Sequence, residues 1–219
     1  MKHITKLTPH FDSSSSRAAL GGKLSHYQEK QNIYSQGTPA STVFYIQQGA
    51  VRLTTQSKHR PPAVTAILGV GDFFGELCLA GLPLHMSTAV ALTASSIRVI
   101  KKRAMIRMIR QKTNNKVSNS FIIYLLSSIK KYQDHVAELL TSSAEQRLAR
   151  VLLRLAHLGR RDPAVGGFPK LNDQVLAEMV GTTRSRINFF MNRFRKRGFI
   201  SYNGQVEVRK SLLRVLQDS

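Results

Sequence analysis

The chain of 219 residues contains 33 Lys and Arg against 12 Asp and Glu, a formal net charge of +21. Such an excess predicts a polyanionic partner, either nucleic acid or an anionic membrane. The single cysteine, Cys78, excludes an internal disulfide and the usual cysteine-ligated metal clusters. No continuous apolar run is long enough to span a bilayer, and the N-terminus lacks the apolar core of a signal peptide, so we expect a cytoplasmic protein.

The positive charge is spread along the chain. Residues 141–219 contain 15 basic and 6 acidic residues, a net charge of +9, which leaves +12 for the first 140 residues. DNA binding by one C-terminal domain would therefore not account for all of the charge. The length and a hydrophobic content of 42% suit two small domains, each with its own core.

Residues 1–26 are polar and are predicted to form an N-terminal arm, with a short helix near Ala18–Leu24. Residues 27–112 follow as a β domain, in which apolar and polar positions alternate and glycines mark the breaks, as in VFYIQQGAVRLTT. Short strands with glycine turns at regular spacing predict a sandwich or barrel, here a β jelly roll that ends in a short helix near Met105–Ile109.

Residues 113–140 are predicted to form one long helix, because apolar residues recur at steps of three and four over several turns. A simple core helix would show this pattern. So would a helix that covers the β domain with one face and pairs with a second copy through the other. The residues assigned to the pairing seam are Phe121, Leu125, Ile129, Tyr132 and Val136.

Residues 141–219 are predicted to form a second domain. Thr141–Ser143 marks the hinge, with Ser143 a candidate N-cap for the next helix. The arginines of that helix, Arg147, Arg150 and Arg154, are expected to form a solvated face rather than a DNA site. Further on, a short helix capped by Asn172 ends at Gly181, and a second helix follows. Two short helices joined by a tight glycine turn are typical of a helix-turn-helix. The pair Asn203-Gly204 then predicts a β-hairpin, which makes the motif a winged helix-turn-helix.

The second helix of this motif is strongly basic, with six Lys and Arg and no acid in residues 184–197. Arg184, Ser185 and Asn188 lie on the face away from the apolar Ile187, and these residue types recognise base edges. A solvated basic face on an ordinary helical hairpin is the alternative. The recognition helix of this motif inserts its N-terminal half into the major groove, which favours DNA.

The segment LAEMVGTTRSRINFFMNRFRKRGFI resembles the DNA-binding signature of the CRP/FNR family of bacterial transcription regulators. The resemblance implies an α+β chain with a jelly roll of the cyclic-nucleotide-binding type, a dimerisation helix and a winged helix-turn-helix domain. It also implies a homodimer that binds a near-palindromic double-stranded operator, with RNA polymerase as a partner. The residues that it assigns to DNA are Thr183, Arg184, Ser185, Arg186, Asn188, Phe189 and Asn192.

Phe189 departs from the family pattern, because many members have a second base-reading arginine there. Phe189 offers only apolar contact, for instance with a thymine methyl group, or it packs inward beside Phe190. We therefore expect an operator that differs from those of well-studied members, with readout by Arg184, Ser185 and Asn188. Thr183 and Arg186 are better placed for phosphate contacts.

The segment GVGDFFGELCLAG is similar to the phosphate-binding cassette of cyclic-nucleotide-binding jelly rolls. By this resemblance, backbone N–H groups near Gly75 would contact an anion and Glu76 would accept from a ribose hydroxyl. The family arginine that pairs with the cyclic phosphate falls on a histidine, and two small hydroxyl residues of the long helix fall on larger residues. The candidate effector residues are Gly75, Glu76, His85, Ser87, Tyr132 and Gln133.

These departures weaken the case for a cyclic nucleotide. Arginine is always charged and pairs with phosphate through two donors, whereas histidine is mostly neutral at pH 7. We therefore expect no usual response to cAMP, and no cofactor is indicated. Two explanations of Gly75 and Glu76 stay open, a turn retained for the barrel itself and a site for a different effector.

The rival interpretation is a nucleotide-sensing signalling protein whose basic C-terminal region binds RNA or anionic membrane. The hairpin after the basic helix argues against it, as does the lack of a wide apolar face opposite the charges. The seven histidines show no metal-ligand spacing, and no nucleophile with a neighbouring base is recognisable, so neither a metal site nor an enzyme is expected.

Overall fold

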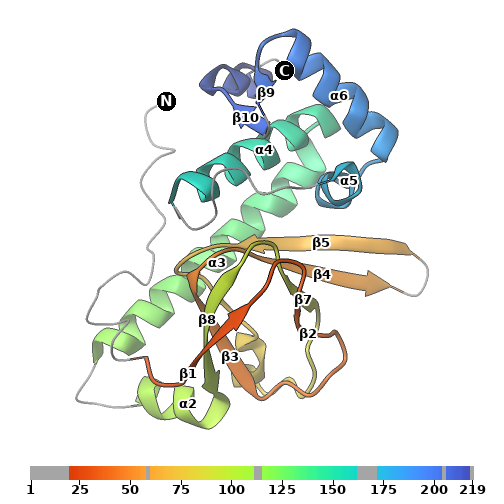
Figure 1. Ribbon diagram of the computed structural model, residues 1–219. Coiled ribbons are helices and arrows are strands. Elements are labelled where there is room, and N and C mark those ends of the chain that lie inside the picture. Colours follow the sequence, from red (N-terminus) through yellow and green to blue (C-terminus); the bar gives the residue numbers. More distant parts are fainter. Residues whose placement is uncertain (1–19, 58–59, 111–114, 162–171, 204–205, 218–219) are drawn as a thin grey trace.

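The computed structural model describes residues 20–57, 60–110, 115–161, 172–203 and 206–217. The N-terminal half is a β-roll of two four-stranded antiparallel sheets, with strand orders β1-β8-β3-β6 and β2-β7-β4-β5 (Figure 1). A short 3-10 helix, η1 (Glu76–Ala80), lies between the sixth and seventh strands. The strands are β1 (Lys23–Tyr27), β2 (Asn32–Tyr34), β3 (Thr42–Gln48), β4 (Val51–Ser57), β5 (Arg60–Leu68), β6 (Phe73–Phe74), β7 (Thr88–Ala91) and β8 (Ser95–Lys101).

The predicted jelly roll is confirmed, but its first strand begins earlier than expected. Residues 23–26, assigned to the polar arm and in part to a short helix, form most of β1 and pair with β8, Leu24 opposite Arg98. A sheet-edge strand is held by backbone hydrogen bonds, so it needs no apolar run to mark it in the sequence. The rest of the expected arm, residues 1–19, lies outside the described residues.

Both faces of the sheet that contains β3 are buried. Along β3, Phe44 and Ile46 point into the roll, whereas Val43 and Tyr45 point outward against the helices. This alternation of a strand with two covered faces explains why four consecutive residues of β3 are buried.

The outer face of that sheet is covered by α2 (Lys102–Arg110) and by the long helix α3 (Asn115–Thr141). The Tyr124 hydroxyl on α3 donates a hydrogen bond to the backbone carbonyl of Phe73 at 2.7 Å. Farther along α3, Lys131 Nζ lies 3.2 Å from Asp72 Oδ1. The long helix is therefore fixed to the roll by an apolar cluster, a buried hydrogen bond and an ion pair.

The assignment of the pairing seam on α3 needs correction. Phe121 is buried in the core between the roll and the helix, and Leu125 packs partly against the same cluster. Residues 121 and 125 share this face with Val117 and Tyr124, which are also buried. The exposed row begins one residue later, at Ile122, and continues at alternating steps of four and three through Leu126, Ile129, Gln133, Val136 and Leu140.

The C-terminal half is a separate small core built from three helices and a hairpin. Its buried residues come from all of these elements and include Leu148, Leu152, Ile187, Phe194 and Leu212. Its helices and strands are α4 (Ala144–Arg161), α5 (Asp173–Val180), α6 (Arg184–Lys196), β9 (Ile200–Tyr202), β10 (Val206–Val208) and the 3-10 helix η3 (Lys210–Leu216). The antiparallel pair β9–β10 confirms the predicted hairpin, although Gly204 lies outside the described residues.

The two halves touch through β5. Ile67 of β5 packs against the core of the C-terminal half, and the Leu158 side chain of α4 lies directly over Gly69. A Cβ atom at Gly69 would lie 2.5 Å from Leu158 Cδ2. Leu158 can therefore pack this closely because glycine has no side chain. Within the described parts of the chain, no helix is long and apolar enough to cross a membrane.

The face assignment on α3 predicts different costs for two truncations on the same turn. Phe121→Ala removes a buried ring from the interface with the roll and should lower the free energy of unfolding by about 3–5 kcal/mol. Ile123→Ala, whose side chain is about half exposed, should cost less than about 1 kcal/mol. Urea denaturation of the two variants and wild type measures both values, and equal losses would show that α3 is wrongly oriented.

Candidate nucleic-acid interface and effector site

Helix α6 is positioned by its caps and by one apolar face. The Asn172 side chain accepts a hydrogen bond from Val175 N at 2.9 Å and starts α5, and Gly181 ends it with φ 69°. The Thr183 hydroxyl then accepts a longer bond of 3.4 Å from Arg186 N at the start of α6. The buried face of α6 consists of Ile187, Phe190, Met191 and Phe194.

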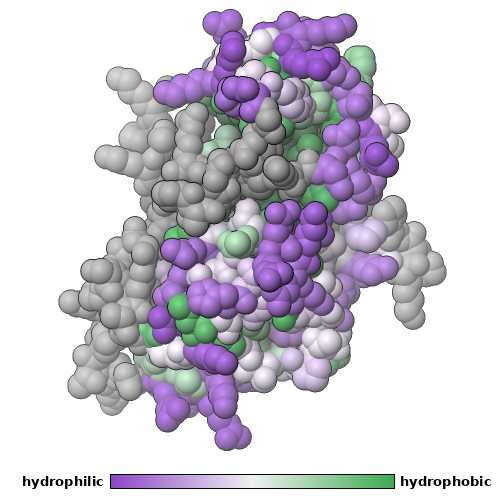
Figure 2. Space-filling view, in the orientation of Figure 1, coloured by the Kyte–Doolittle hydropathy of each residue, from purple (hydrophilic) through white to green (hydrophobic). Residues whose placement is uncertain are grey.

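The opposite face of α6 is exposed and carries every residue that the sequence assigned to DNA. These residues are Thr183, Arg184, Ser185, Arg186, Asn188, Phe189 and Asn192. Hydrophilic surface extends along this side of the molecule in Figure 2. None of these side chains belongs to the core, so all of them can contact a ligand that lies along the helix.

The arginines of α6 are not equivalent. Arg193 Nη1 lies 3.0 Å from Glu145 Oε2, so Arg193 ties α6 to α4. The Arg186 guanidinium lies over the Phe190 ring, 5.8 Å from its centroid. Among the described residues, Arg184 has no such contact and is fully available for an external partner. The structure thus separates one structural arginine from those that face outward.

Asn188 is held in one orientation by its neighbour. Asn192 Nδ2 donates a hydrogen bond of 2.8 Å to Asn188 Oδ1, one turn away on the exposed face. One lone pair of the Asn188 oxygen is thereby used, and its amide NH₂ group remains available to donate outward. This bond restricts the orientation of the Asn188 amide.

Phe189 points outward from α6. Its side chain is 62% exposed, and its edge-to-face contact with Phe190 has a centroid distance of 5.6 Å. Of the two alternatives for Phe189, packing into the core is therefore wrong for this structure. The exposed ring is therefore free to contact an external partner.

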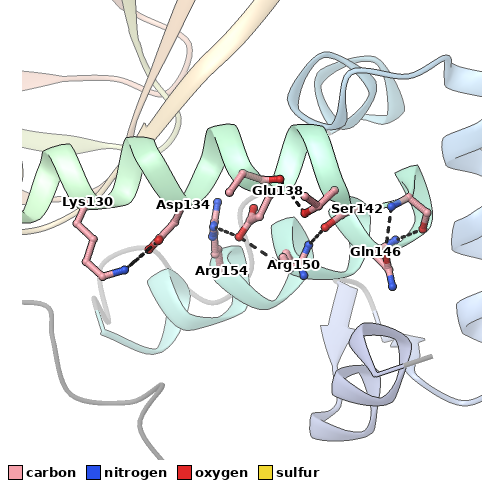
Figure 3. Close-up of polar contacts among 10 residues, drawn as sticks. Lys130, Asp134, Glu138, Ser142, Gln146, Arg150 and Arg154 are labelled. Carbon is pink, nitrogen blue, oxygen red and sulfur yellow. Dashed lines mark hydrogen bonds and ion pairs between the residues drawn. The ribbon is translucent and has the colours of Figure 1, made fainter. Parts of the chain in front are cut away.

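The hinge between α3 and α4 is held by polar contacts (Figure 3). Glu138, in the last turn of α3, lies 2.7 Å from Arg154 Nη2 and 3.8 Å from Arg150 Nε of α4. Arg150 also donates to the Ser142 hydroxyl. Arg150 and Arg154 were expected on a solvated face, but they fold α4 back against the end of α3.

The start of α4 is a capping box. The Ser143 hydroxyl accepts from Gln146 N at 3.2 Å, and Gln146 Oε1 accepts from Ser143 N at 3.0 Å, which confirms the predicted cap. Arg147 donates to the carbonyl of Ser142 at 2.7 Å and to that of Val180 at 2.9 Å. This side chain, which sequence reasoning left on the surface, joins the hinge to the end of α5.

The candidate effector site lies where η1 meets the roll. Gly75 has φ 74°, and a Cβ atom there would lie 2.9 Å from the carbonyl oxygen of Thr42 and 3.0 Å from Phe44 Cδ2. Glycine is thus required by the barrel itself, which supports the retained-turn explanation. Burial raises the pKa of the neighbouring Glu76 carboxyl, with a smaller contribution from the charge of Asp72.

His85 is buried and stacked. Its ring lies parallel to that of Tyr34, with centroids 3.7 Å apart and an interplanar angle of 10°, and Tyr34 also contacts Phe44 and Phe74. Burial lowers the pKa of His85, so the imidazole is neutral at pH 7. The position that corresponds to the family's phosphate-binding arginine therefore carries no charge and takes part in an aromatic cluster.

Tyr34 is the member of this site that sequence reasoning missed. Burial raises its pKa strongly, a hydrogen bond with Ser87 opposes this, and the charges of Glu76 and Tyr132 add to it. The structure therefore brings Glu76, Ser87 and Tyr132 together around one tyrosine. Gln133 is exposed on α3 and borders a different groove. No local sequence signal connects Tyr34 with His85, because they meet only in the folded roll.

Protein-family models match both halves of the chain. The model of the cyclic nucleotide-binding domain matches residues 24–112, and the model of the Crp-like helix-turn-helix domain matches residues 146–213. The chain belongs to the CRP/FNR family. Its α5–Gly181–α6 unit is thus the helix-turn-helix of a CRP/FNR transcription regulator, and its β-roll is a domain of the cyclic-nucleotide-binding type.

Two curated CRP/FNR relatives cover most of the chain. The CRP-like cAMP-activated global transcriptional regulator of Mycobacterium tuberculosis is 23% identical over 177 residues, which are 79% of this chain and 77% of the relative. The transcriptional regulator LdrP of Thermus thermophilus is 25% identical over 180 residues, 81% of this chain and 87% of the relative.

Two solved CRP/FNR structures share the fold. FixK2 from Bradyrhizobium japonicum superposes with a TM-score of 0.73 at 20% identity, over 90% of this chain and 97% of that one. The c-di-GMP responsive global regulator CLP of Xanthomonas campestris gives 0.69 at 17% identity, over 89% and 96%. At these identities the likeness shows the fold alone.

The neutral stack predicts a pH dependence of stability. Because the folded-state pKa of His85 is lower than its ordinary value of about 6.5, the unfolded chain binds more protons just below that pH. The neutral His85 ring makes its full contribution to stability at pH values above the ordinary pKa of histidine. This contribution is lost as the pH falls toward the folded-state pKa. The free energy of unfolding should therefore decrease as the pH is lowered from about 7.5 to 5.5. In His85→Phe this decrease should be smaller.

Denaturant titrations of wild type and His85→Phe at the two pH values measure this difference. The other histidines and the carboxylates are common to both proteins and cancel in the comparison. An identical pH dependence in the two proteins would show that His85 is protonated equally in the folded and unfolded states.

Proposed function

We propose that the protein is a homodimeric, cytoplasmic transcription regulator that recognises a specific near-palindromic DNA operator through α6 and does not require cAMP. The observation that carries the proposal is the exposed face of α6, where the assigned DNA residues lie together and away from the core. RNA polymerase is a partner by the same family resemblance. The basic balance of the chain supports a polyanionic ligand.

Base recognition would rest on four side chains in the first half of α6. Arg184 is available to pair with guanine, and Asn188, with its amide group directed outward, is placed to donate to an acceptor in the major groove. Ser185 can donate or accept, and Phe189 offers its exposed ring to a thymine methyl group. The recognition face has one available arginine and one phenylalanine. We therefore expect its operator to differ from the operators of proteins that read bases with two arginines.

Phosphate contacts would fix the register of α6 on the duplex. Thr183 lies at the helix N-terminus, where the backbone N–H groups point outward and the helix dipole favours an anion. Arg186 is exposed and lies against Phe190, which restricts its guanidinium to the outer edge of the helix. Such contacts add affinity without sequence information.

Dimerisation would use the exposed heptad row of α3. Ile129, Val136 and Leu140 line a groove of about 490 Å³ together with Tyr132, Gln133 and Ala137, and Ile122 and Leu126 extend the row toward the start of the helix. Exposed apolar residues at alternating steps of four and three form the seam of a two-stranded coiled coil. A second copy of α3 would bury them, and Gln133 would lie within the seam as a polar position.

The effector domain is proposed not to respond to cAMP in the usual way, although curated relatives are described as cAMP-activated. The proposal is supported by the neutral, buried His85, by its stack on Tyr34, and by Tyr132 at a position where cAMP-responsive members have a small hydroxyl residue. Among the described residues, no Lys or Arg contributes a charge at His85 that would balance a cyclic phosphate. Any effector of this site remains unidentified.

Two substitutions on α6 separate base readout from phosphate contact. Arg184→Ala should cost about 1–3 kcal/mol on an operator selected from random duplexes, and should relax the preference at one base pair per half-site. Arg186→Ala should weaken binding to operator and scrambled duplexes about equally, and should lower the salt slope by about one unit for each phosphate that Arg186 neutralises.

Anisotropy titrations of both variants on both duplexes across a salt series make the comparison. The assignment of the reading face is wrong if Arg184→Ala lowers the two affinities by the same factor. If neither variant nor wild type prefers any selected duplex, sequence-specific recognition itself is contradicted.

The seam on α3 is tested by charge insertion. Leu126→Glu places a carboxylate in the proposed coiled coil and should convert dimers to monomers that bind the operator at least about tenfold more weakly, because two half-sites no longer act together. Ile123→Glu, on an exposed position outside the row, should stay dimeric. Light scattering at micromolar concentration distinguishes them, and a monomeric wild type would refute the seam.

A further inference from the structure

Helix α2 carries a row of arginines on the face that it turns away from the core. Arg103, Arg107 and Arg110 are spaced at i, i+4 and i+7, which places them on one side of the helix. All three are exposed, whereas Met105 on the opposite side is fully buried. Lys101, the last residue of β8, is exposed beside the first turn. We call these four basic residues the arginine face.

Among the residues that the structure describes, no carboxylate neutralises the arginine face. The sequence contains no Asp or Glu between Glu76 and Asp134, while residues 101–116 include seven Lys and Arg. Within the described residues, no Asp or Glu forms an ion pair with any residue of the face. Other arginines of the protein do have acidic partners, since Arg154 and Arg193 each contact a glutamate.

The stability of the fold does not explain this arrangement. Arg103 lies in the first turn of α2, where the positive end of the helix dipole disfavours a cation, and that turn has no acid. Arg103 and Arg107 are also four residues apart, a spacing at which like charges repel. Only Arg107 and Arg110, in the last turn, are favoured by the dipole. A charge pattern that partly opposes folding is expected where a ligand supplies the compensating charge.

The arginine face is remote from the recognition helix. Figure 1 places α2 and α6 at opposite ends of the molecule, separated by the β-roll and the hinge. In Figure 2 hydrophilic side chains project from the end where α2 lies. A straight duplex seated on α6 therefore does not reach α2, so an anion on the arginine face would be a different segment or a different molecule.

We propose that the arginine face is a second DNA-binding surface, which holds the phosphates of a duplex segment other than the one read by α6. Guanidinium groups pair with phosphate through two donors, and contacts to phosphate carry no sequence information. The contact is therefore electrostatic and independent of sequence. One protein would then hold two DNA segments together.

The inference rests on the proposed function, because it takes DNA as the ligand that α6 already binds. Once α6 occupies an operator, neighbouring segments of the same DNA molecule are present at high effective concentration, so a weak contact is sufficient. DNA also carries a denser array of negative charge than most acidic protein surfaces, which suits a row of arginines without any neutralising carboxylate.

A bridging assay with the full chain tests the proposal. A selected operator duplex is fixed to beads and saturated with protein, and capture of a labelled duplex without the operator is measured. Wild type should capture it, and Arg107→Glu should lower capture roughly tenfold while changing the affinity for a short operator duplex by no more than about twofold. Lys30→Glu, which makes the same charge change at an 87% exposed side chain on the β1–β2 turn, should capture like wild type.

Thermal melting controls for misfolding. Arg107→Glu loses a favourable interaction with the helix dipole but replaces the repulsion from Arg103 with an attraction, so the melting temperature should change little. Equal capture by Arg107→Glu and wild type, or no capture by wild type at saturating operator, overturns the proposal. The proposal is also overturned if no duplex is captured while a polyglutamate chain binds wild type but not Arg107→Glu. That result would assign the face to an acidic protein. In each of these cases unchanged binding of the short operator would leave the function of α6 intact.

Discussion

The packing of α3 against the β-roll determines which face of α3 is exposed and where the hinge to α4 begins. Val117, Phe121 and Tyr124 close the outer face of the sheet, and the Tyr124 hydroxyl satisfies the carbonyl of Phe73. Because this face of the helix is committed to the roll, the exposed heptad row must lie on the other side. The same helix then ends at the hinge, where it sets the direction of α4.

The hinge transmits that direction to the recognition helix through short polar contacts. Glu138 holds α4 against the end of α3, and Arg147 joins the hinge carbonyl of Ser142 to the last carbonyl of α5. The ion pair of Glu145 with Arg193 then connects α4 directly to α6. Partly exposed ion pairs are individually weak, so the orientation of α6 depends on several contacts that act together.

The helix-turn-helix could be predicted almost residue by residue because its signals are local. Asn172 is read as the cap of α5 and Gly181 as its end from the sequence alone, and the structure confirms both. Thr183 caps α6. Two of the five residues assigned to the seam, Phe121 and Leu125, lie against the roll. They were misplaced because α3 carries two apolar rows one residue apart, and sequence periodicity does not say which row faces the roll. Phe121 belongs to the buried row and Ile122 to the exposed one.

The effector site shows where prediction from sequence ends. Counting along the chain identified His85, but its stack on Tyr34 joins residues 51 positions apart and follows only from the closed roll. The arginines of α4 were likewise placed on the surface because their glutamate partner lies on another helix. Long-range polar contacts of this kind leave no periodic trace in the sequence.

The central claim is that α6 of this regulator recognises DNA without help from cAMP. The most direct measurement is the dissociation constant for a selected operator duplex, determined without ligand and again with cAMP in large excess. The neutral, stacked His85 predicts tight and equal binding in both titrations. Specific binding that appears only when cAMP is present would contradict the account.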